Sequence, residues 1–229
     1  MFIYPVNIIN KKNLYFIRKY FAGPAAGFTL IELLISITVF LIGIMAAFSL
    51  SLYNLNTSKD NANRVIAADL AREGIEIVRN IRDSNWLALE ADVDSDPSTP
   101  LTIELYAWDH GLDLANFLVQ YDNNSIMPFT NAPANIEAAI ADDESKLYLF
   151  GDFYKHGGNS SDASLFRRAI NLRAVCLNTA TKVESVSNNL ICSGTDEKIG
   201  LQITSRVRYI YGNKTNTIDA VEKIYNWRQ

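Results

Sequence analysis

Hydrophobic residues form one long run near the start of this chain. Residues 28–52 are apolar apart from scattered serines and threonines, which can return their hydroxyls to a helix backbone, and one acid, Glu32. A helix of that length would be about 37 Å long, enough to cross the roughly 30 Å core of a bilayer. No other segment has the same character to cover it, so a transmembrane helix is favoured over a buried core helix. Gly43 and Gly74 each weaken helix formation by about 1 kcal/mol, so they are predicted to be soft points, positions at which the helix is least stable.

Helical periodicity continues beyond the apolar run. Apolar residues recur at steps of three and four, and charged residues take the other positions. This stripe consists of Ala67, Ala71, Gly74, Ile75, Val78, Ile81 and Trp86. Since no proline lies between Pro24 and Pro97, we expect one continuous helix over 28–83. Its part over about 28–52 would cross the membrane, and its amphipathic part over about 60–83 would lie on a soluble domain.

The last third of the chain alternates with a period of two. In Ile199–Tyr209 apolar residues occupy every second position, with Ser205 as the exception. Phe166–Leu177 and Ile218–Trp227 follow noisier versions of the pattern. These segments predict three antiparallel strands with one covered face, and the amphipathic helix is the natural cover. The fold class is therefore expected to be α+β, with the long N-terminal helix packed on a C-terminal antiparallel sheet.

An acidic, proline-bounded segment separates the helix from the rest. The aspartates of Asp92–Pro100 resemble the start of a calcium loop. However, Pro97 and Ile103 stand where an EF-hand needs a glycine and a bidentate acid. We therefore expect a solvated linker over 84–100 and a globular β-rich head over 101–229.

The start of this head is less regular. Leu101–Trp108 and Lys146–Phe150 are predicted strands, and Leu112–Tyr121 fits either a short helix or a strand. Two segments rich in Asn, Gly, Ser and Pro, Asn123–Asn135 and His156–Asp162, are predicted loops.

The charges are distributed unevenly along the chain, and this predicts its orientation in a membrane. Residues 1–27 carry Lys11, Lys12, Arg18 and Lys19 and no acid, whereas the formal charge of the whole chain is −4. The body is therefore acidic, which argues against broad nucleic-acid binding by net charge. The bases come first, then small residues, then the apolar run, an order that differs from a secretory signal. The positive-inside rule keeps the basic leader in the cytoplasm and places the body across the membrane.

The chain has two cysteines, Cys176 and Cys192. Their spacing fits no metal motif. If the head lies outside the cytoplasm, a disulfide is the natural interpretation, and it would stabilise the fold by about 3 kcal/mol. Two unrelated buried thiols are the alternative.

No catalytic pattern emerges. The chain has no nucleophile elbow, no HExxH, no phosphate-binding glycine loop and no CxxC, so we expect no enzyme, no cofactor and no metal. His110 and His156 are predicted to be surface-loop histidines. Trp86, Trp108 and Trp227 are predicted to pack in the core or between the helix and the sheet, and a carbohydrate-binding platform is the alternative.

One group of bases suggests a binding function. Arg206 and Arg208 share a strand face, and Arg167, Arg168 and Arg173 lie on another predicted strand. The Arg206–Arg208 stripe could bind an anion such as DNA. A solvated outer sheet face is the alternative.

The residues Gly27–Leu34 (GFTLIELL) resemble the cleavage and methylation signature of type IV prepilins and of the pseudopilins of type II secretion. The basic leader, the Gly–Phe junction, the glutamate and the apolar helix occur together. Ala71–Arg79 and the terminal strand pattern ending in Trp227-Arg228 are similar to minor pilins. The resemblance implies a pilin-like fold.

The resemblance also implies roles for single residues. A prepilin peptidase would cut between Gly27 and Phe28, and the new amine of Phe28 would be N-methylated. Glu32 would face the Phe28 amine of a neighbouring subunit. A carboxylate and an ammonium neutralise each other in a low dielectric, and a wrong register leaves both unpaired. The implied partners are other pilin subunits through the N-terminal helix, the prepilin peptidase/methyltransferase, an inner-membrane assembly platform and the lipid bilayer.

We therefore expect a structural subunit, a minor pilin or pseudopilin, of a type IV pilus-like filament. It would cross the inner membrane once with its C-terminal domain outside the cytoplasm, and then enter a pilus on the cell surface or a pseudopilus in the periplasm. The alternatives are a tip adhesin or DNA-uptake pilin, with a surface ligand or DNA as partner, and a minor pseudopilin of a type II secretion system. The long leader, Ser49 where many major pilins have a proline, and the irregular middle favour a minor subunit.

Overall fold

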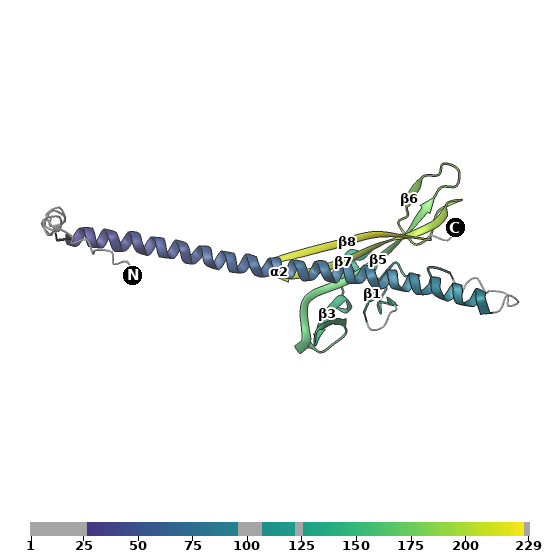
Figure 1. The fold of residues 1–229 in the computed structure, drawn as a ribbon, viewed down its shortest axis with the longest axis horizontal. Coiled ribbons are helices and arrows are strands. Elements are labelled where there is room, and N and C mark those ends of the chain that lie inside the picture. Colours follow the sequence, from purple (N-terminus) through teal and green to yellow (C-terminus); the bar gives the residue numbers. More distant parts are fainter. Residues whose placement is uncertain (1–26, 96–106, 122–125, 227–229) are drawn as a thin grey trace, which may run out of the picture. The chain divides into compact units, whose positions relative to one another are not determined.

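The computed structural model describes residues 27–95, 107–121 and 126–226. The chain divides into two compact units, Met1–Asn56 and Thr57–Gln229. One helix, α2 (Leu30–Ser95), contributes to both units. The second unit, which we call the head, contains the sheet (Figure 1).

The first part of α2 satisfies its polar groups locally. Thr29 precedes the helix, and its hydroxyl accepts a hydrogen bond from the backbone N–H of Glu32 at 3.3 Å. This is the N-cap arrangement that satisfies a free donor in the first turn. The Ser36 and Ser49 hydroxyls donate to the carbonyls of Glu32 and Met45 at 2.8 and 2.9 Å. These two hydroxyls are therefore paired with the helix backbone inside the apolar segment.

The predicted end of the helix at Asp83 is wrong. The helix runs on to Ser95, so residues 84–95 of the predicted acidic linker are helical. The physical reason lies in the sequence, since 86–91 contains Leu, Ala and Glu, which are good helix formers, and the next proline is Pro97. Residues 96–100 lie outside the described part.

The head sheet is antiparallel throughout its described strands. The strands are β1 (Asn116–Val119), β2 (Ile126–Met127), β3 (Lys146–Phe150), β4 (Phe153–His156), β5 (Ala163–Leu177), β6 (Glu184–Val186), β7 (Glu197–Tyr211) and β8 (Lys214–Tyr225). β5 is central, because β7 pairs with it along one edge and β3, β1 and β6 pair with the other edge. β8 pairs with β7.

Each face of the sheet has its own cover. The apolar stripe of α2 packs on one face, where Val78 and Ile81 join Leu172, Leu201 and Ile203 in the main core. A second cluster lies along the same helix around Ala67, Leu70, Phe166, Val207 and Tyr209.

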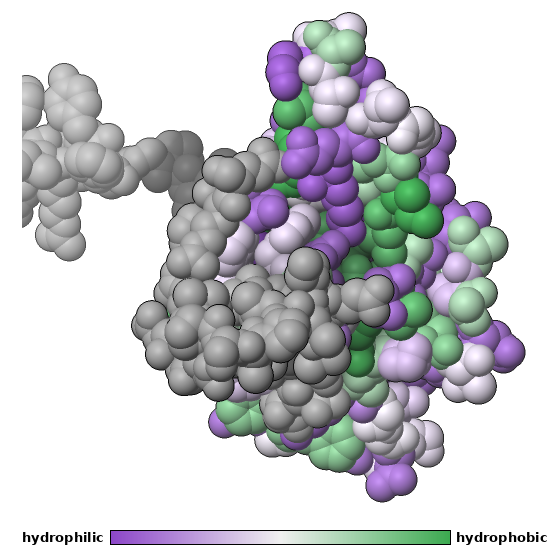
Figure 2. Space-filling model, turned by 90° about the vertical axis from the view of Figure 1, so that its right-hand side faces the viewer, coloured by the Kyte–Doolittle hydropathy of each residue, from purple (hydrophilic) through white to green (hydrophobic). Residues whose placement is uncertain are grey.

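The short helix α3 (Ile136–Ala141) covers part of the other face, with Ala139 and Ile140 packed against Leu118, Phe129 and Ala169. This arrangement confirms the α+β prediction of a helix packed on an antiparallel sheet. The face drawn in Figure 2 shows an apolar strip between hydrophilic residues, so some apolar surface of the molecule stays exposed.

The predicted strands of the last third correspond to β5, β7 and β8, although Trp227 lies outside the described residues. In the middle of the chain, Lys146–Phe150 is β3, and Leu112–Tyr121 contains a strand rather than a helix. Trp108 lies in a turn, and residues 101–106 of that predicted strand lie outside the described part.

The two predicted loops contain short regular elements. β2 lies inside the first of them, whose residues 123–125 are not described. The second begins with the last residue of β4 and ends in a 3-10 turn, Ser160–Asp162. The sequence patterns did not indicate α3 or β4, since a helix of six residues and a strand of four show too few repeats of a period to be recognised.

Candidate functional site

The junction at Gly27–Phe28 lies immediately before α2 and is open to solvent. Both residues are exposed, and a Cβ built on Gly27 would meet no atom within 4 Å. Thr29 caps the helix directly after the junction. The bond between Gly27 and Phe28 is therefore accessible. Phe28 lies two residues before the first residue of α2, Leu30.

An uncovered apolar surface follows this junction. Every residue from Gly27 to Lys59 is exposed, including the large apolar side chains of Leu30–Leu55. Within the described residues, α2 is the one helix long and apolar enough to cross a membrane. Exposed apolar surface of this extent is unfavourable in water and marks a lipid or protein contact.

Glu32 is the single charged residue of this surface before Lys59. It lies in the first turn of α2, where a carboxylate is favoured by the helix dipole. Within the described part of the chain its carboxylate has no ion pair. A carboxylate in an apolar, lipid-compatible surface needs a cation from elsewhere, because isolation in a low dielectric is costly.

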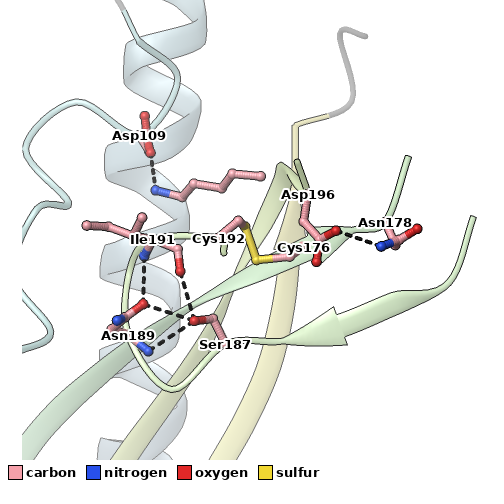
Figure 3. The surroundings of a disulfide bond; sticks show 9 residues. Asp109, Cys176, Asn178, Ser187, Asn189, Ile191, Cys192 and Asp196 are labelled. Carbon is pink, nitrogen blue, oxygen red and sulfur yellow. Dashed lines mark hydrogen bonds and ion pairs between the residues drawn. A yellow bond between two sulfur atoms is a disulfide. The ribbon is translucent and has the colours of Figure 1, made fainter. Parts of the chain in front are cut away.

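Cys176 and Cys192 form a disulfide, with their Cα atoms 5.7 Å apart (Figure 3). Cys176 lies near the end of β5, and Cys192 lies on the excursion that leaves β5 and returns as β7. Ser187 donates to the Ile191 carbonyl at 2.8 Å, and Asn189 accepts from the Ile191 N–H at 3.0 Å. The bond and this local network together anchor the excursion to the sheet.

Arg206 and Arg208 lie on the sheet face opposite α2, but neither presents a free charge. Arg206 binds both carboxylate oxygens of Asp219, at 2.7 and 2.5 Å, and also pairs with Glu137. Arg208 pairs with the second oxygen of Glu137 at 2.7 Å. The Asp219 and Glu137 partners raise the pKa of Arg206. This pairing argues against the anion-binding hypothesis, because an anion would have to displace two acids that already neutralise the stripe.

Arg167 and Arg173, both on β5, differ in their surroundings. Arg167 donates to the carbonyls of Ala141 and Asp142 and pairs with Asp143 at 2.8 Å, so it holds the C-terminal end of α3. Arg173 is half-buried.

Arg168 is completely buried on the α2 side of β5. Its Nη1 lies 3.0 Å from Glu73 Oε1 and donates to the Leu70 carbonyl, while its Nη2 donates to the Val119 carbonyl. Arg168 therefore cannot contribute to an anion-binding surface, although the sequence grouped it with the other strand arginines. Period-two alternation with Phe166 and Ile170 was the signal that could have placed it inside.

The prediction of a surface loop is also wrong for His156. It is 6 % exposed at the end of β4, and its Nδ1 lies 3.2 Å from the Glu144 carbonyl. Burial, and then the positive charge of Arg168, lower the pKa of His156 to about 3. His110 is exposed in a turn, as predicted.

The tryptophans of the described part pack as expected. Trp86 is buried and Trp108 packs on the main core, whereas Trp227 lies outside the described residues.

Over the described ranges, no group of three or more His, Cys, Asp or Glu side chains is arranged to hold a metal ion. The chemistry that these residues do offer is an accessible junction, an unpaired carboxylate and an apolar contact surface. Comparison with known proteins identifies the same region: residues 24–48 match the family model described as the prokaryotic N-terminal methylation motif. No curated protein and no solved structure matches the chain.

Proposed function

Because the N-terminal methylation motif marks this chain as type IV prepilin- or pseudopilin-like, we propose that it is a minor structural subunit of a type IV pilus-like filament. It would be cut after Gly27, held in the inner membrane and assembled through α2. The observation that carries the proposal is an exposed apolar helix that begins directly after an accessible Gly–Phe junction, with one carboxylate in its first turn.

The chemistry of the junction links processing to assembly. Cleavage creates an amine on Phe28, less than two helical turns from Glu32. In a bundle of such helices, this amine and the Glu32 carboxylate of a neighbour can neutralise each other in low dielectric. A neighbour shifted along the axis would leave both charges unpaired, at a cost of several kcal/mol. We therefore assign Glu32 to setting the register between subunits, with N-methylation of Phe28 as the accompanying modification.

Three features support a membrane-anchored precursor with its head outside the cytoplasm. The bases of residues 1–27 favour retention of the leader in the cytoplasm. The following helix has the length and composition of a membrane span. The disulfide Cys176–Cys192 fits an oxidising compartment. The prepilin peptidase/methyltransferase and an inner-membrane assembly platform are the partners that this route requires.

The irregular part of the head, residues 107–162, supports a minor rather than a bulk subunit. Its described residues, 107–121 and 126–162, combine α3 with four short strands and two 3-10 turns, and irregular surface segments commonly carry specific recognition. A tip adhesin, or a minor pseudopilin of a type II secretion system, uses the same helix and remains a variant of the proposal. A DNA-uptake role gains no support from Arg206 and Arg208, since both are paired with acids.

Mass spectrometry of the assembled or membrane-held protein tests the proposal. The mature chain should begin at Phe28 and carry one N-terminal methyl group. Gly27→Leu should abolish the cut, whereas Gly43→Leu, a matched change on the same exposed surface, should not. A Cβ added at either glycine would meet no atom within 4 Å, so misfolding would not explain a difference. Intact Met1 in assembled filaments would refute the proposal.

A further inference from the structure

An open cleft of the head lies between α2 and β4. Its volume is about 460 Å³, and sites for small molecules commonly measure about 300–1,000 Å³. The described part of its lining consists of Glu73, Tyr121, Asp152, Phe153, Tyr154 and Lys155. All of these residues belong to the head, so the cleft does not depend on where the apolar segment lies.

Two aromatic rings form an apolar wall of this cleft. Tyr121 and Phe153 are stacked, with their planes 5° from parallel and their centroids 6.3 Å apart. They are nevertheless 70 and 59 % exposed, so much of their surface stays available to a ligand. The face of an aromatic ring carries the negative part of its quadrupole and therefore attracts C–H bonds, whose hydrogens are slightly positive. This wall suits a ligand with a C–H face.

The other walls are held in place by the core. The ring of Tyr154 contacts Phe166 edge-on, with centroids 5.7 Å apart, and Phe166 is buried in the cluster along α2. On the helix side, Glu73 Oε1 lies 3.0 Å from Nη1 of Arg168, which is fully buried. Walls that are already ordered lose little conformational freedom when a ligand binds, which favours affinity.

The charges of the described lining balance. Asp152 and Lys155 carry opposite charges, and the charge of Glu73 is compensated by Arg168. A cation or an anion would therefore gain no net attraction here. A carboxylate in an ion pair still has lone pairs that accept from hydroxyl groups, and an ammonium group donates to them. The rim of the cleft is thus suited to an uncharged ligand with hydroxyl groups.

A second cleft continues the first one along α2. It shares Glu73 and Tyr121 with the first cleft and has a volume of about 560 Å³. The rest of its described lining is mostly polar and comprises Glu76, Ile77, Arg79, Asn80 and Asp83. Its acids Glu76 and Asp83 are each paired with an arginine of the same helix. A ligand that extends beyond the aromatic wall would therefore meet further hydrogen-bonding groups with compensated charges.

A sugar ring combines the two properties that this cleft requires. One face of a pyranose presents C–H bonds, and its rim carries hydroxyl groups that donate and accept. An apolar side chain of a neighbouring subunit would cover the rings of Tyr121 and Phe153, but it could not bind the charged groups of the rim. We propose that the cleft binds a neutral saccharide, with a sugar ring against Tyr121 and Phe153. Its hydroxyl groups would bind Glu73, Asp152 and Lys155.

This inference goes beyond the proposed function, because a site within the head requires neither cleavage nor assembly. Saturation-transfer difference NMR on the full chain tests it. The chain is kept in lauryldimethylamine oxide, a detergent without a sugar headgroup. The neutral probes are lactose, cellobiose, mannobiose and chitobiose, and the charged probes are galacturonic acid and trilysine. The ring C–H protons of at least one neutral probe should receive saturation, and the charged probes should give weaker signals.

Substitutions locate the binding. Phe153→Ala removes half of the aromatic wall and should weaken binding about fivefold in a titration. Asp152→Asn keeps the size of the side chain but removes its charge, so it should also weaken binding and provides a second test if Phe153→Ala is unstable. The control is Tyr225→Ala, which removes a 38 % exposed ring on β8 outside the described lining of both clefts. It should bind the saccharide as the parent does, and urea midpoints would verify the fold of each variant.

Four results would overturn the inference. The first is an absence of saturation transfer to every neutral probe. The second is equal weakening by Phe153→Ala and Tyr225→Ala, since the signal would then not come from the cleft. The third is transfer confined to the charged probes. The fourth is poor entry of Phe153→Ala into filaments without any saccharide signal, which would assign the cleft to contact with a neighbouring subunit.

Discussion

At Gly74 the backbone of α2 lies directly against the sheet. A Cβ at this position would lie 2.5 Å from Ser205 Oγ and 2.8 Å from Ile170 Cδ1, and these two residues are paired across β5 and β7. The same contact explains why Ser205 interrupts the apolar alternation of β7, because a larger side chain would collide with the helix. Gly74 was predicted to be a soft point, and the structure gives it a packing role instead.

Gly74→Ala should therefore destabilise the head although alanine is the better helix former. Overpacking typically costs about 1–3 kcal/mol, against a gain of about 1 kcal/mol in helix propensity, so a net loss of up to about 2 kcal/mol is expected. Urea unfolding of the full chain in detergent would measure it. Gly43→Ala is the control, since no atom lies within 4 Å of its Cβ position, and it should not lower stability. A second change, Ser205→Gly, should restore part of the loss.

His156 is the buried residue with the clearest consequence for pH. Its Nδ1 lies against a carbonyl, which can only accept, so the neutral ring carries its proton on Nδ1. Protonation of the other nitrogen would place a second buried charge near Arg168. Burial is the larger cause and Arg168 the second cause of its low pKa, about 3.

This shift predicts that stability falls on the acid side. The unfolded chain binds a proton at His156 near pH 6.5, while the folded chain resists it until about pH 3. The neutral His156 ring therefore makes its full contribution to the free energy of unfolding above pH 6.5. That contribution is lost as the pH falls from 6.5 towards 3. Between pH 6.5 and pH 5 the loss should be about 2 kcal/mol. His156→Asn keeps a donor for the Glu144 carbonyl but does not titrate, so its urea midpoint should change less over this range. Parallel curves for both proteins would contradict the assignment.

At the scale of elements, Arg168 joins three parts of the head. From β5 it reaches Glu73 and the Leu70 carbonyl on α2, and the Val119 carbonyl on β1. Burial lowers the pKa of its guanidinium, and Glu73 opposes that effect. A buried ion pair is weak evidence for stability in itself, but removing one partner leaves the other charge uncompensated.

Glu73→Ala should therefore be costly. Breaking a buried pair typically costs about 3–5 kcal/mol, and because the Glu73 side chain is 33 % exposed we expect about 2–3 kcal/mol in urea unfolding. Asp69→Ala is the matched control on the same helix, since it removes an exposed pair with Arg72 and should have no measurable effect. Equal effects of the two substitutions would show that Glu73 does not compensate Arg168.

The longest elements of the head, the strands β5, β7 and β8 and the helical stripe of α2, could be predicted because their patterns are local. The alternation around Leu201 and Ile203 and the helical stripe around Val78 report faces that any partner would have to cover. The end of α2 could not be read from acidity, since charged residues are compatible with an exposed helix. α3 could not be predicted, because its six residues make less than two helical turns and so show too little of the helical period.

At the scale of the whole molecule, the described part of the first unit, residues 27–56, has an apolar surface with one charged side chain, Glu32, and the head has the packed core. The proposed register device predicts that Glu32→Ala is cleaved normally but enters filaments poorly, because the Phe28 amine of a neighbour would remain unpaired in low dielectric. The measurement is the fraction of subunit in sheared filaments, with the N-terminus checked by mass spectrometry. Ser36→Ala, one turn further along, removes only a hydroxyl bonded to the Glu32 carbonyl and should assemble normally. Normal incorporation of Glu32→Ala would contradict the pairing role.

The processing junction, the apolar helix and the period-two strands are properties of neighbouring residues, so they are present in the sequence before any fold exists. The tertiary structure alone decided that Glu73 pairs with Arg168, that His156 is buried, that Arg206 and Arg208 are paired with acids, and that Gly74 makes room for Ser205. Each of these depends on a residue far away along the chain, such as Glu73 for Arg168 or Glu137 for Arg206. Burial and charge pairing arise only when distant segments meet, and no local pattern specifies which segments those are.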